Sequence, residues 1–342
     1  RIQLSGDIDQ LSLTRVNDNG FCNGDVMGVY IVDYDGGTPG TLKASGNRGD
    51  NVRHTFDEPN YRWNSAYDLY WKDKHTHIDV YGYYPFADPE SVDDYQFEVK
   101  RDQSKPSENG EMGGYEASDF LWGKVADVAP TTSVIRLPMK HRMANARVTL
   151  VEGSGFAAGE WAGTEKTVLA PNLIRKASIN LADGTVTANG SVEATATMPS
   201  RSGNEWRAIV VPQTVKAGVT LFSITIGGVP YKFAKNEAFT YMPGKMSNFS
   251  IRVDKKAGSG QYQLTLISES ITPWENDLVS HNATAKEYVV VNCPTAGGLQ
   301  DAIAAAKLDY TKVTNLKITG EINDIDFNFM RNSMKALEAL NL

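Results

Sequence analysis

The stretch "VMGVYIVDYDGG" (residues 26–37) is apolar at almost every position until it breaks at an Asp-Gly-Gly turn. Successive side chains of a strand point to opposite faces. One face would carry Met27, Val29 and Ile31, and the other Val26, Tyr30 and Val32. A strand that is apolar on both faces is covered on both sides. We therefore predict that this stretch forms an inner strand of a layered β protein.

The same alternation continues outward along the chain, through residue 270. "HIDVYGYYPF" (77–86), "ARVTLVEG" (146–153) and "NFSIRVD" (248–254) each alternate with a period of two. Two hairpin turns are explicit, at Asp183-Gly184 and at Gly227-Gly228. We find no convincing amphipathic helix in this part. Many short strands without intervening helices predict antiparallel β-sandwiches.

Length and composition limit the class of protein. A chain of 342 residues, 41% hydrophobic and 22% charged, suits a soluble globular protein of two or three domains. Its net charge of −7, without a run of Lys and Arg, argues against a nucleic-acid partner. No apolar stretch is long enough for a membrane-spanning helix. The chain starts at Arg1 without a leader, so we expect any export signal to have been removed.

The last part of the chain has a different pattern. "AGGLQDAIAAAKL" (296–308) and "DIDFNFMRNSMKAL" (324–337) are helical, and a short strand separates them. The closing "LEALNL" (337–342) has the LxxLxL spacing of a leucine-rich-repeat strand, and at least about three such repeats are needed for a stable stack. We therefore predict an α/β leucine-rich-repeat entry segment over 277–342 that the natural protein continues. Breaks near residues 125–137 and 254–260 predict two sandwiches before it, at 1–140 and 141–276.

Seven segments together resemble the fimbrillin family of the Bacteroidetes, in the order found there. They are "FCNGDVMGVYI" (21–31), "YWKDKHTHIDVYGYYPF" (70–86), "SDFLWGK" (118–124), "MKHRMANARVTL" (139–150), "AIVVPQTV" (208–215), "YMPGKMSNFSIRV" (241–253) and "SITPWEN" (270–276). The resemblance covers residues 1 to 276. The segment that follows resembles the start of surface leucine-rich-repeat proteins from the same bacteria.

The resemblance implies a fold and a way of assembling. It implies two tandem transthyretin-like β-sandwich domains in an exported protein, anchored at the outer membrane through a lipidated cysteine that this chain lacks. It implies polymerisation by strand exchange with neighbouring pilus or surface subunits, after an arginine-specific protease removes the first strand. In "LSLTRVNDNGF" (11–21), the resemblance places that cut between Arg15 and Val16. The structural alternative is that Arg15 merely flanks a loop.

The chain departs from the family because it continues well past the second sandwich. A bulky C-terminal segment would obstruct head-to-tail stacking, so we expect a pilus tip or accessory subunit rather than a shaft subunit. The alternative is a non-polymerising surface lipoprotein. Its sandwiches would form a stalk for a repeat module that binds a host protein or glycan. A third alternative is an enzyme that acts on surface polysaccharide.

Residues 61–86 contain nine aromatic side chains, far above the 10% average of the chain. We interpret most of them as sandwich core and cross-strand pairs. The alternative is a platform on which sugar rings stack. Tyr81 and Tyr83 are then the candidates for glycan contact, because they share a strand face with the polar Asp79.

The sequence offers no recognisable catalytic or metal site. His75 and His77 are two residues apart and share a strand face, but no third ligand is spaced to complete a metal site. Cys22 and Cys293 are far apart and form no CxxC motif. No nucleophile elbow, P-loop or dinucleotide fingerprint is present. We therefore predict no catalytic residue, no metal, no cofactor and no enzymatic activity.

Overall fold

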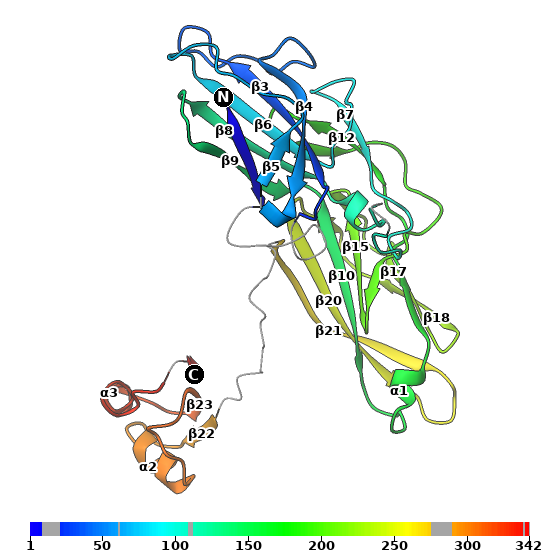
Figure 1. Cartoon of the computed structure of the whole chain (residues 1–342). Coiled ribbons are helices and arrows are strands. Elements are labelled where there is room, and N and C mark those ends of the chain that lie inside the picture. The colour runs from blue at the N-terminus through cyan, green and yellow to red at the C-terminus, as the bar shows by residue number, and fades with distance from the viewer. Residues whose placement is uncertain (9–20, 61, 109–111, 275–288, 338, 342) are drawn as a thin grey trace. The chain divides into compact units, whose positions relative to one another are not determined.

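The computed structural model describes residues 1–8, 21–60, 62–108, 112–274, 289–337 and 339–341. By its internal contacts the chain divides into two compact parts, Arg1–Asn276 (unit 1) and Asp277–Leu342 (unit 2). Strands dominate the described residues, so the prediction of a mainly β protein is confirmed (Figure 1). Among these residues, no helix is long and apolar enough to span a membrane.

A seven-stranded sheet in the order β1-β9-β8-β6-β3-β4-β5 forms the first part of unit 1. Its strands are β1 (Gln3–Ile8), β3 (Val26–Asp33), β4 (Gly49–Asp57), β5 (Arg62–Ser65), β6 (Ile78–Tyr84), β8 (Leu121–Val128) and β9 (Val134–His141). The stretch that we expected to be an inner strand is β3, which lies between β6 and β4. All its side chains from Met27 to Val32 are buried, as the apolar pattern on both faces predicts.

The two faces of this sheet belong to different cores. Met27, Val29 and Ile31 pack into one core, while Tyr30 and Val32 pack into another. The second core includes the three-stranded sheet β13-β12-β7, made of β7 (Tyr95–Glu98), β12 (Lys176–Asn180) and β13 (Thr185–Ala188). The hairpin β12–β13 turns at the predicted Asp183-Gly184, where Gly184 adopts a positive φ of 73°.

The second part of unit 1 packs two further sheets around a third core. One has the order β14-β15-β10-β20-β21 and the other β11-β17-β18. The strands are β10 (Ala144–Glu152), β11 (Lys166–Leu169), β14 (Ser200–Ser202), β15 (Glu205–Val210), β17 (Thr220–Ile226), β18 (Val229–Ala234), β20 (Lys245–Lys255) and β21 (Tyr262–Pro273). The hairpin β17–β18 uses the predicted Gly227-Gly228 turn. A small sheet joins β16 (Gln213–Val215) to β19 (Phe239–Tyr241), and α1 (Glu160–Gly163) is a single turn.

Strand direction differs from the prediction at two places. β1 pairs in parallel with β9, and β10 pairs in parallel with β20, so the expectation of purely antiparallel sheets is wrong. Hairpins force neighbouring strands to be antiparallel, but strands separated by a hundred or so residues can pair in either direction. The local pattern contains no signal for that choice.

Strand pairing also crosses the predicted domain boundary at residue 140. β7 precedes the boundary and β12 follows it, yet Phe97 and Ala177 are directly paired. Both halves contribute to one core, for example through Tyr83 and Ile179. The division of residues 1–276 into two domains therefore stays a prediction.

Unit 2 contains a parallel sheet in the order β22-β23-β24, with β22 (Val289–Cys293), β23 (Asn315–Gly320) and β24 (Ala339–Asn341). The predicted helical stretches contain α2 (Leu299–Ala305) and α3 (Asp324–Ser333). Leu299, Ile303, Leu316 and Met330 are members of a core that is separate from those of unit 1. The predicted alternation of helices and strands in this part of the chain is therefore found.

Candidate functional site

The first strand occupies the edge of the seven-stranded sheet. β1 pairs with β9 over six residues, from Gln3 opposite Val134 to Ile8 opposite Met139. Only one side of β1 is paired within this sheet, because β1 is the first strand in its order. An edge strand is held by one ladder of backbone hydrogen bonds and by the side chains that it buries. The retention of β1 therefore depends on its side chains and end contacts as well as on this single ladder.

The inward face of β1 is seated in the core. Ile2 and Leu4 are 4% and 6% exposed. Gly6 follows on the same face, and the indole Nε1 of Trp63 donates a hydrogen bond of 3.1 Å to its carbonyl oxygen. A Cβ atom at Gly6 would lie 3.0 Å from Met27 Sδ and 3.4 Å from Trp63 Nε1. The third inward position is therefore a glycine because the Met27 and Trp63 side chains fill the space.

Two contacts hold the start of β1 to the segment between β5 and β6. The Ile2 amide donates a hydrogen bond of 2.7 Å to the carbonyl of Leu69. The Arg1 guanidinium lies 2.6 Å from the Asp68 carboxylate. β1 and the two residues before it thus contact β9 on one side and the Trp63–Leu69 segment on the other.

The cleavage candidates Arg15 and Val16 lie outside the described residues. The described strand before this segment and the residue after it both contact Trp63. β1 ends at Ile8, and the described chain continues at Phe21. The centroid of the Phe21 ring lies 4.8 Å from that of Trp63 and 5.5 Å from that of Tyr84. Cleavage between Arg15 and Val16 would therefore separate two segments that contact one indole.

Tyr81 and Tyr83, the candidates for glycan contact, are buried, which agrees with the interpretation of these aromatics as sandwich core and not with the sugar platform. Tyr81 is 5% exposed and Tyr83 is 1% exposed, because β7 packs against this face of β6. The Tyr83 and Tyr95 ring centroids are 5.8 Å apart, and the Tyr83 hydroxyl donates to the carbonyl of Ala87 at 2.6 Å. Burial raises the pKa of the Tyr83 hydroxyl well above its usual value. Neither ring presents a face to which a sugar could bind.

The exposed aromatic side chains of this region are in the loop between β5 and β6 instead. Tyr67 and Tyr70 are 54% and 59% exposed. Trp71 is half-buried, with its indole nitrogen donating to the carbonyl of Thr131 at 3.1 Å. The one signal for this difference in the sequence is that Tyr67 and Tyr70 lie outside the stretches that alternate with a period of two.

The histidines of the "HTH" stretch do not converge on a metal site. His77 Nδ1 lies 2.7 Å from a carboxylate oxygen of Asp127, and the His75 amide donates to Asp73 at 2.7 Å. Within the described ranges, no three His, Cys, Asp or Glu side chains are grouped as metal ligands. Cys22 and Cys293 form no disulfide with one another.

A second open edge belongs to β21, which lies outermost in its sheet next to β20 (Figure 1). Leu266, Ile267 and Ile271 on this strand are 38–48% exposed. A long edge strand with apolar side chains is a template for pairing with another chain. The signal in the sequence is the alternation of Leu and Ile with Ser and Thr in "QLTLISESIT" (263–272).

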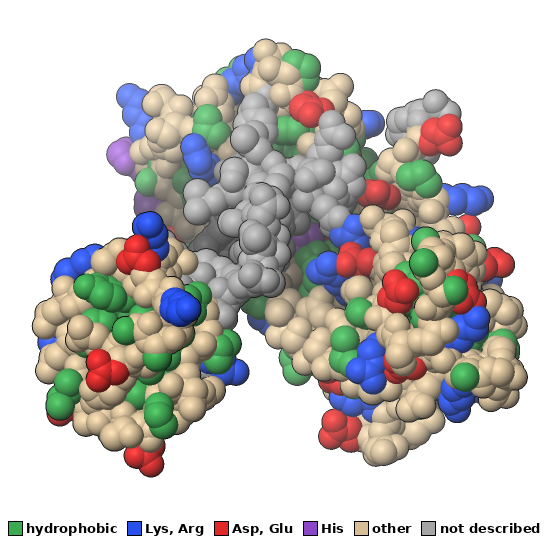
Figure 2. Space-filling view, turned by 90° about the horizontal axis from the view of Figure 1, so that it is seen from below, with side chains coloured by type: hydrophobic (Ala, Val, Ile, Leu, Met, Phe, Trp, Pro, Cys, Tyr) green, Lys and Arg blue, Asp and Glu red, His purple; other side chains and the backbone are tan. Residues whose placement is uncertain are grey.

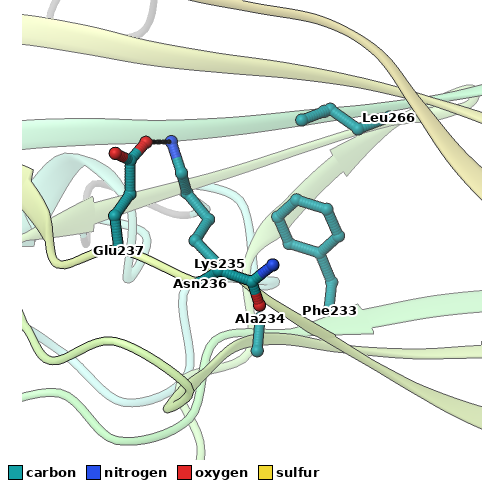
Figure 3. A pocket seen from close by; sticks show the side chains of 6 residues that line it. All are labelled: Phe233, Ala234, Lys235, Asn236, Glu237 and Leu266. Atoms are coloured by element: carbon teal, nitrogen blue, oxygen red, sulfur yellow. Dashed lines mark ion pairs between the residues drawn. The ribbon is translucent and has the colours of Figure 1, made fainter.

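An open slot of about 600 Å³ lies between β21 and the end of β18. Its lining residues are Phe233, Ala234, Lys235, Asn236, Glu237 and Leu266 (Figure 3). Lys235 Nζ lies 3.3 Å from Glu237 and 2.6 Å from Glu269. Hydrogen bonds to Glu269 and Glu237 raise the pKa of the Lys235 ammonium. The slot combines the apolar side chains of Phe233, Ala234 and Leu266 with charged side chains at its edge.

On the face of the molecule that Figure 2 shows, neither positive nor negative side chains dominate. On the face shown in Figure 2, Lys and Arg side chains alternate with Asp and Glu side chains over the described surface. This face therefore presents no basic patch to a polyanion.

One protein family and several solved structures are similar to this chain. A family model described as fimbrillin-like matches residues 14–274. The solved structure of a candidate cell adhesion protein from Bacteroides uniformis has a TM-score of 0.56 at 16% identity, covering 80% of this chain and 98% of that chain. A second one, from Bacteroides ovatus, has a TM-score of 0.54 at 14% identity, covering 80% and 97%. No curated protein matches the chain. At these identities the likeness to the solved structures concerns the fold.

Proposed function

Because the chain belongs to the fimbrillin-like family, we propose that it is a structural or adhesive protein of the bacterial cell surface, which associates with neighbouring subunits. The observation that carries the proposal is the position of β1 at a sheet edge, with Ile2 and Leu4 seated in the core. The similar structures from two Bacteroides species are described as candidate cell adhesion proteins, which supports the same role. No positive feature points to a reaction, so we propose no enzymatic activity.

The finer proposal is assembly by strand exchange. Cleavage between Arg15 and Val16 would leave β1 without a covalent link to β3. Its departure would expose Leu137 and Met139 and one row of backbone groups on β9. A strand from a neighbouring subunit would cover these side chains again and pair with the backbone of β9, which is β-augmentation. Each Leu- or Ile-sized side chain that it buries contributes about 1.5–3 kcal/mol.

The edge of β21 is the second surface that we assign to subunit contacts. Its exposed Ile267 and Ile271 favour association with another chain, and the slot beside Leu266 offers further apolar area. A protein with one displaceable edge strand and one open edge can contact two neighbours.

A protease experiment tests strand exchange. The folded protein is treated with a limiting amount of an arginine-specific protease, and the new N-terminus is sequenced. We expect Val16 as the new N-terminus, followed by multimers in size-exclusion chromatography that resist SDS. Arg15→Lys is the matched control, because it keeps the charge but removes the cleavage site. Cleavage only at other arginines, or monomers that persist after loss of β1, would contradict the proposal.

The second candidate function follows from unit 2. In unit 2, Leu316 of β23 pairs with Leu340 of β24, a spacing within the roughly 20–29 residues of leucine-rich repeats. We propose that unit 2 is the entry segment of such a repeat region. If assembly fails, unit 1 would act as a two-sandwich, transthyretin-like stalk of a surface lipoprotein that presents these repeats to a host protein or glycan. Because the bulk of unit 2 would obstruct head-to-tail stacking, the pilus position that we propose is at the tip or accessory, not in the shaft.

A further inference from the structure

The loop between β5 and β6 presents two tyrosine rings to solvent. In the described part of unit 1, Tyr67 and Tyr70 are the aromatic side chains that are more than a third exposed. They lie three residues apart, on either side of Leu69, which is 4% exposed. Aromatic side chains elsewhere in unit 1 are buried or half-buried, so this pair is not part of the general surface of the sheet. We call residues 65–71 the tyrosine loop.

The tyrosine loop is fixed along its whole length. Leu69 is inserted in the core, and its carbonyl accepts from Ile2 at 2.7 Å. Ser65 Oγ donates to the carbonyl of Tyr67 at 2.7 Å, and the amide of Ala66 donates to the carbonyl of Arg53 at 2.8 Å. Trp71 closes the loop through Thr131. A loop that is already ordered loses little conformational entropy when a ligand binds, so it is preorganised for binding.

Polar groups lie beside the rings. The Tyr70 hydroxyl donates to Asp68 Oδ2 at 3.1 Å, and Arg1 lies 2.6 Å from Asp68 Oδ1. The Asp68 side chain is 48% exposed, so its carboxylate is within reach of a ligand hydroxyl. The loop is followed by exposed Lys72 and Asp73. The patch therefore combines apolar ring faces with acceptors and donors over a short distance.

We infer that the tyrosine loop is a carbohydrate-binding site, in which Tyr67 and Tyr70 stack on the apolar face of a hexopyranose and Asp68 accepts from its hydroxyls. A sugar ring has one apolar C–H face and a polar rim, which matches a ring flanked by a carboxylate. A protein partner would need roughly 800 Å² per side with an apolar centre. Beside the two rings, the side chains at this loop are the charged Arg1, Asp68, Lys72 and Asp73, which favours a ligand with many hydroxyls over an apolar protein surface. The inference rests on the adhesive role proposed above and names its ligand class.

The test uses the uncleaved full chain and an array of immobilised neutral oligosaccharides of galactose, mannose and N-acetylglucosamine. We expect binding to at least one of them. The double variant Tyr67→Leu/Tyr70→Leu should weaken binding at least about tenfold, because leucine keeps apolar bulk but has no aromatic face. Tyr67→Phe/Tyr70→Phe should bind within about threefold of the wild type, since it keeps both rings. Asp68→Asn should weaken binding while the rings remain.

Three results would overturn the inference. One is that the folded wild type binds no oligosaccharide on the array. Another is that the Leu and Phe double variants bind equally well. The third is binding to phosphatidylglycerol vesicles with no sugar binding, which would make the loop a membrane contact. Val192→Ser, at an exposed apolar residue outside both the tyrosine loop and the β21 edge, is the control for general surface hydrophobicity. Assembly after cleavage is measured separately, so a chain that polymerises without binding sugar refutes only the carbohydrate site.

Discussion

At the scale of single residues, one buried carboxylate organises unit 2. Asp326 is 1% exposed and accepts hydrogen bonds from the amides of Gly297 at 2.6 Å, Leu299 at 2.9 Å and Asn323 at 2.9 Å. It therefore joins the start of α2 to the start of α3. Asn323 completes the capping box, because its side chain accepts from the Ile325 amide at 2.9 Å.

The environment of Asp326 predicts an acid-sensitive unit 2. Burial raises the pKa of this carboxyl, but the three amide donors outweigh burial and leave the pKa below its usual value. Its stabilisation is then present above the ordinary aspartate pKa of about 3.9 and is lost as the pH falls through the lower folded pKa. Asp326→Asn should cost about 1–3 kcal/mol, since an amide oxygen replaces a carboxylate that serves three donors.

Calorimetric unfolding of the full chain between pH 3 and pH 6 measures this effect. We expect the Asp326→Asn protein to show a smaller pH dependence of unit 2 stability than the wild type. Asp324→Asn is the matched control, because Asp324 is exposed in the first turn of the same helix. Equal losses in the two variants would show that Asp326 acts only through general charge near the helix start.

At the scale of elements, β1 is the segment on which the proposed function depends. The inward positions at the start of the chain are Ile2, Leu4 and Gly6. The two residues before β1 are held as well, Arg1 by Asp68 and Ile2 by Leu69. These contacts are enough to seat the strand. Its partner ladder is confined to β9 within the sheet, which makes β1 separable from the rest of the sheet in a way that β3 is not.

Substitution in β1 should loosen it without unfolding the sheet. We expect Leu4→Ser to lower the free energy of unfolding of unit 1 by about 1.5–3 kcal/mol, the value of one buried leucine side chain. Urea unfolding followed by tryptophan fluorescence measures the change. Gln3→Ser is the control, because Gln3 is an exposed neighbour on the other face. If the two variants lose the same stability, burial of the inward face does not hold β1.

At the scale of the whole molecule, the two units have separate cores. All six tryptophans of the chain lie in unit 1, at positions 63, 71, 122, 161, 206 and 274. Tryptophan fluorescence therefore reports on unit 1, while calorimetry reports on both units. Separate cores predict separate unfolding transitions.

Combining the two variants tests this independence. We expect Leu4→Ser to change the fluorescence transition and Asp326→Asn to leave it unchanged. In the double variant the two free-energy changes should add within about 0.5 kcal/mol, as for sites that share no partners. A fluorescence transition that shifts on Asp326→Asn would show that unit 1 and unit 2 unfold together.

The sequence alone determined the features that depend on near neighbours. The apolar run from Met27 to Val32 specified a strand covered on both faces, and the Asp183-Gly184 and Gly227-Gly228 turns placed two hairpins. The helix and strand order of unit 2 followed from the same local patterns, as did the resemblance to fimbrillins that the family match confirms. Side-chain period and turn chemistry act over a few residues, so they can be read without a partner segment.

Tertiary structure alone decided which segments meet, and therefore which polar-looking faces are covered. β7 covers the face of Tyr81 and Tyr83, which beside Asp79 looked exposed, whereas Tyr67 and Tyr70 were left in solvent. The parallel pairing of β1 with β9, and the three donors that converge on Asp326, join segments that the sequence separates. Strand direction and the burial of a given face depend on contacts between distant segments, and no local period encodes them.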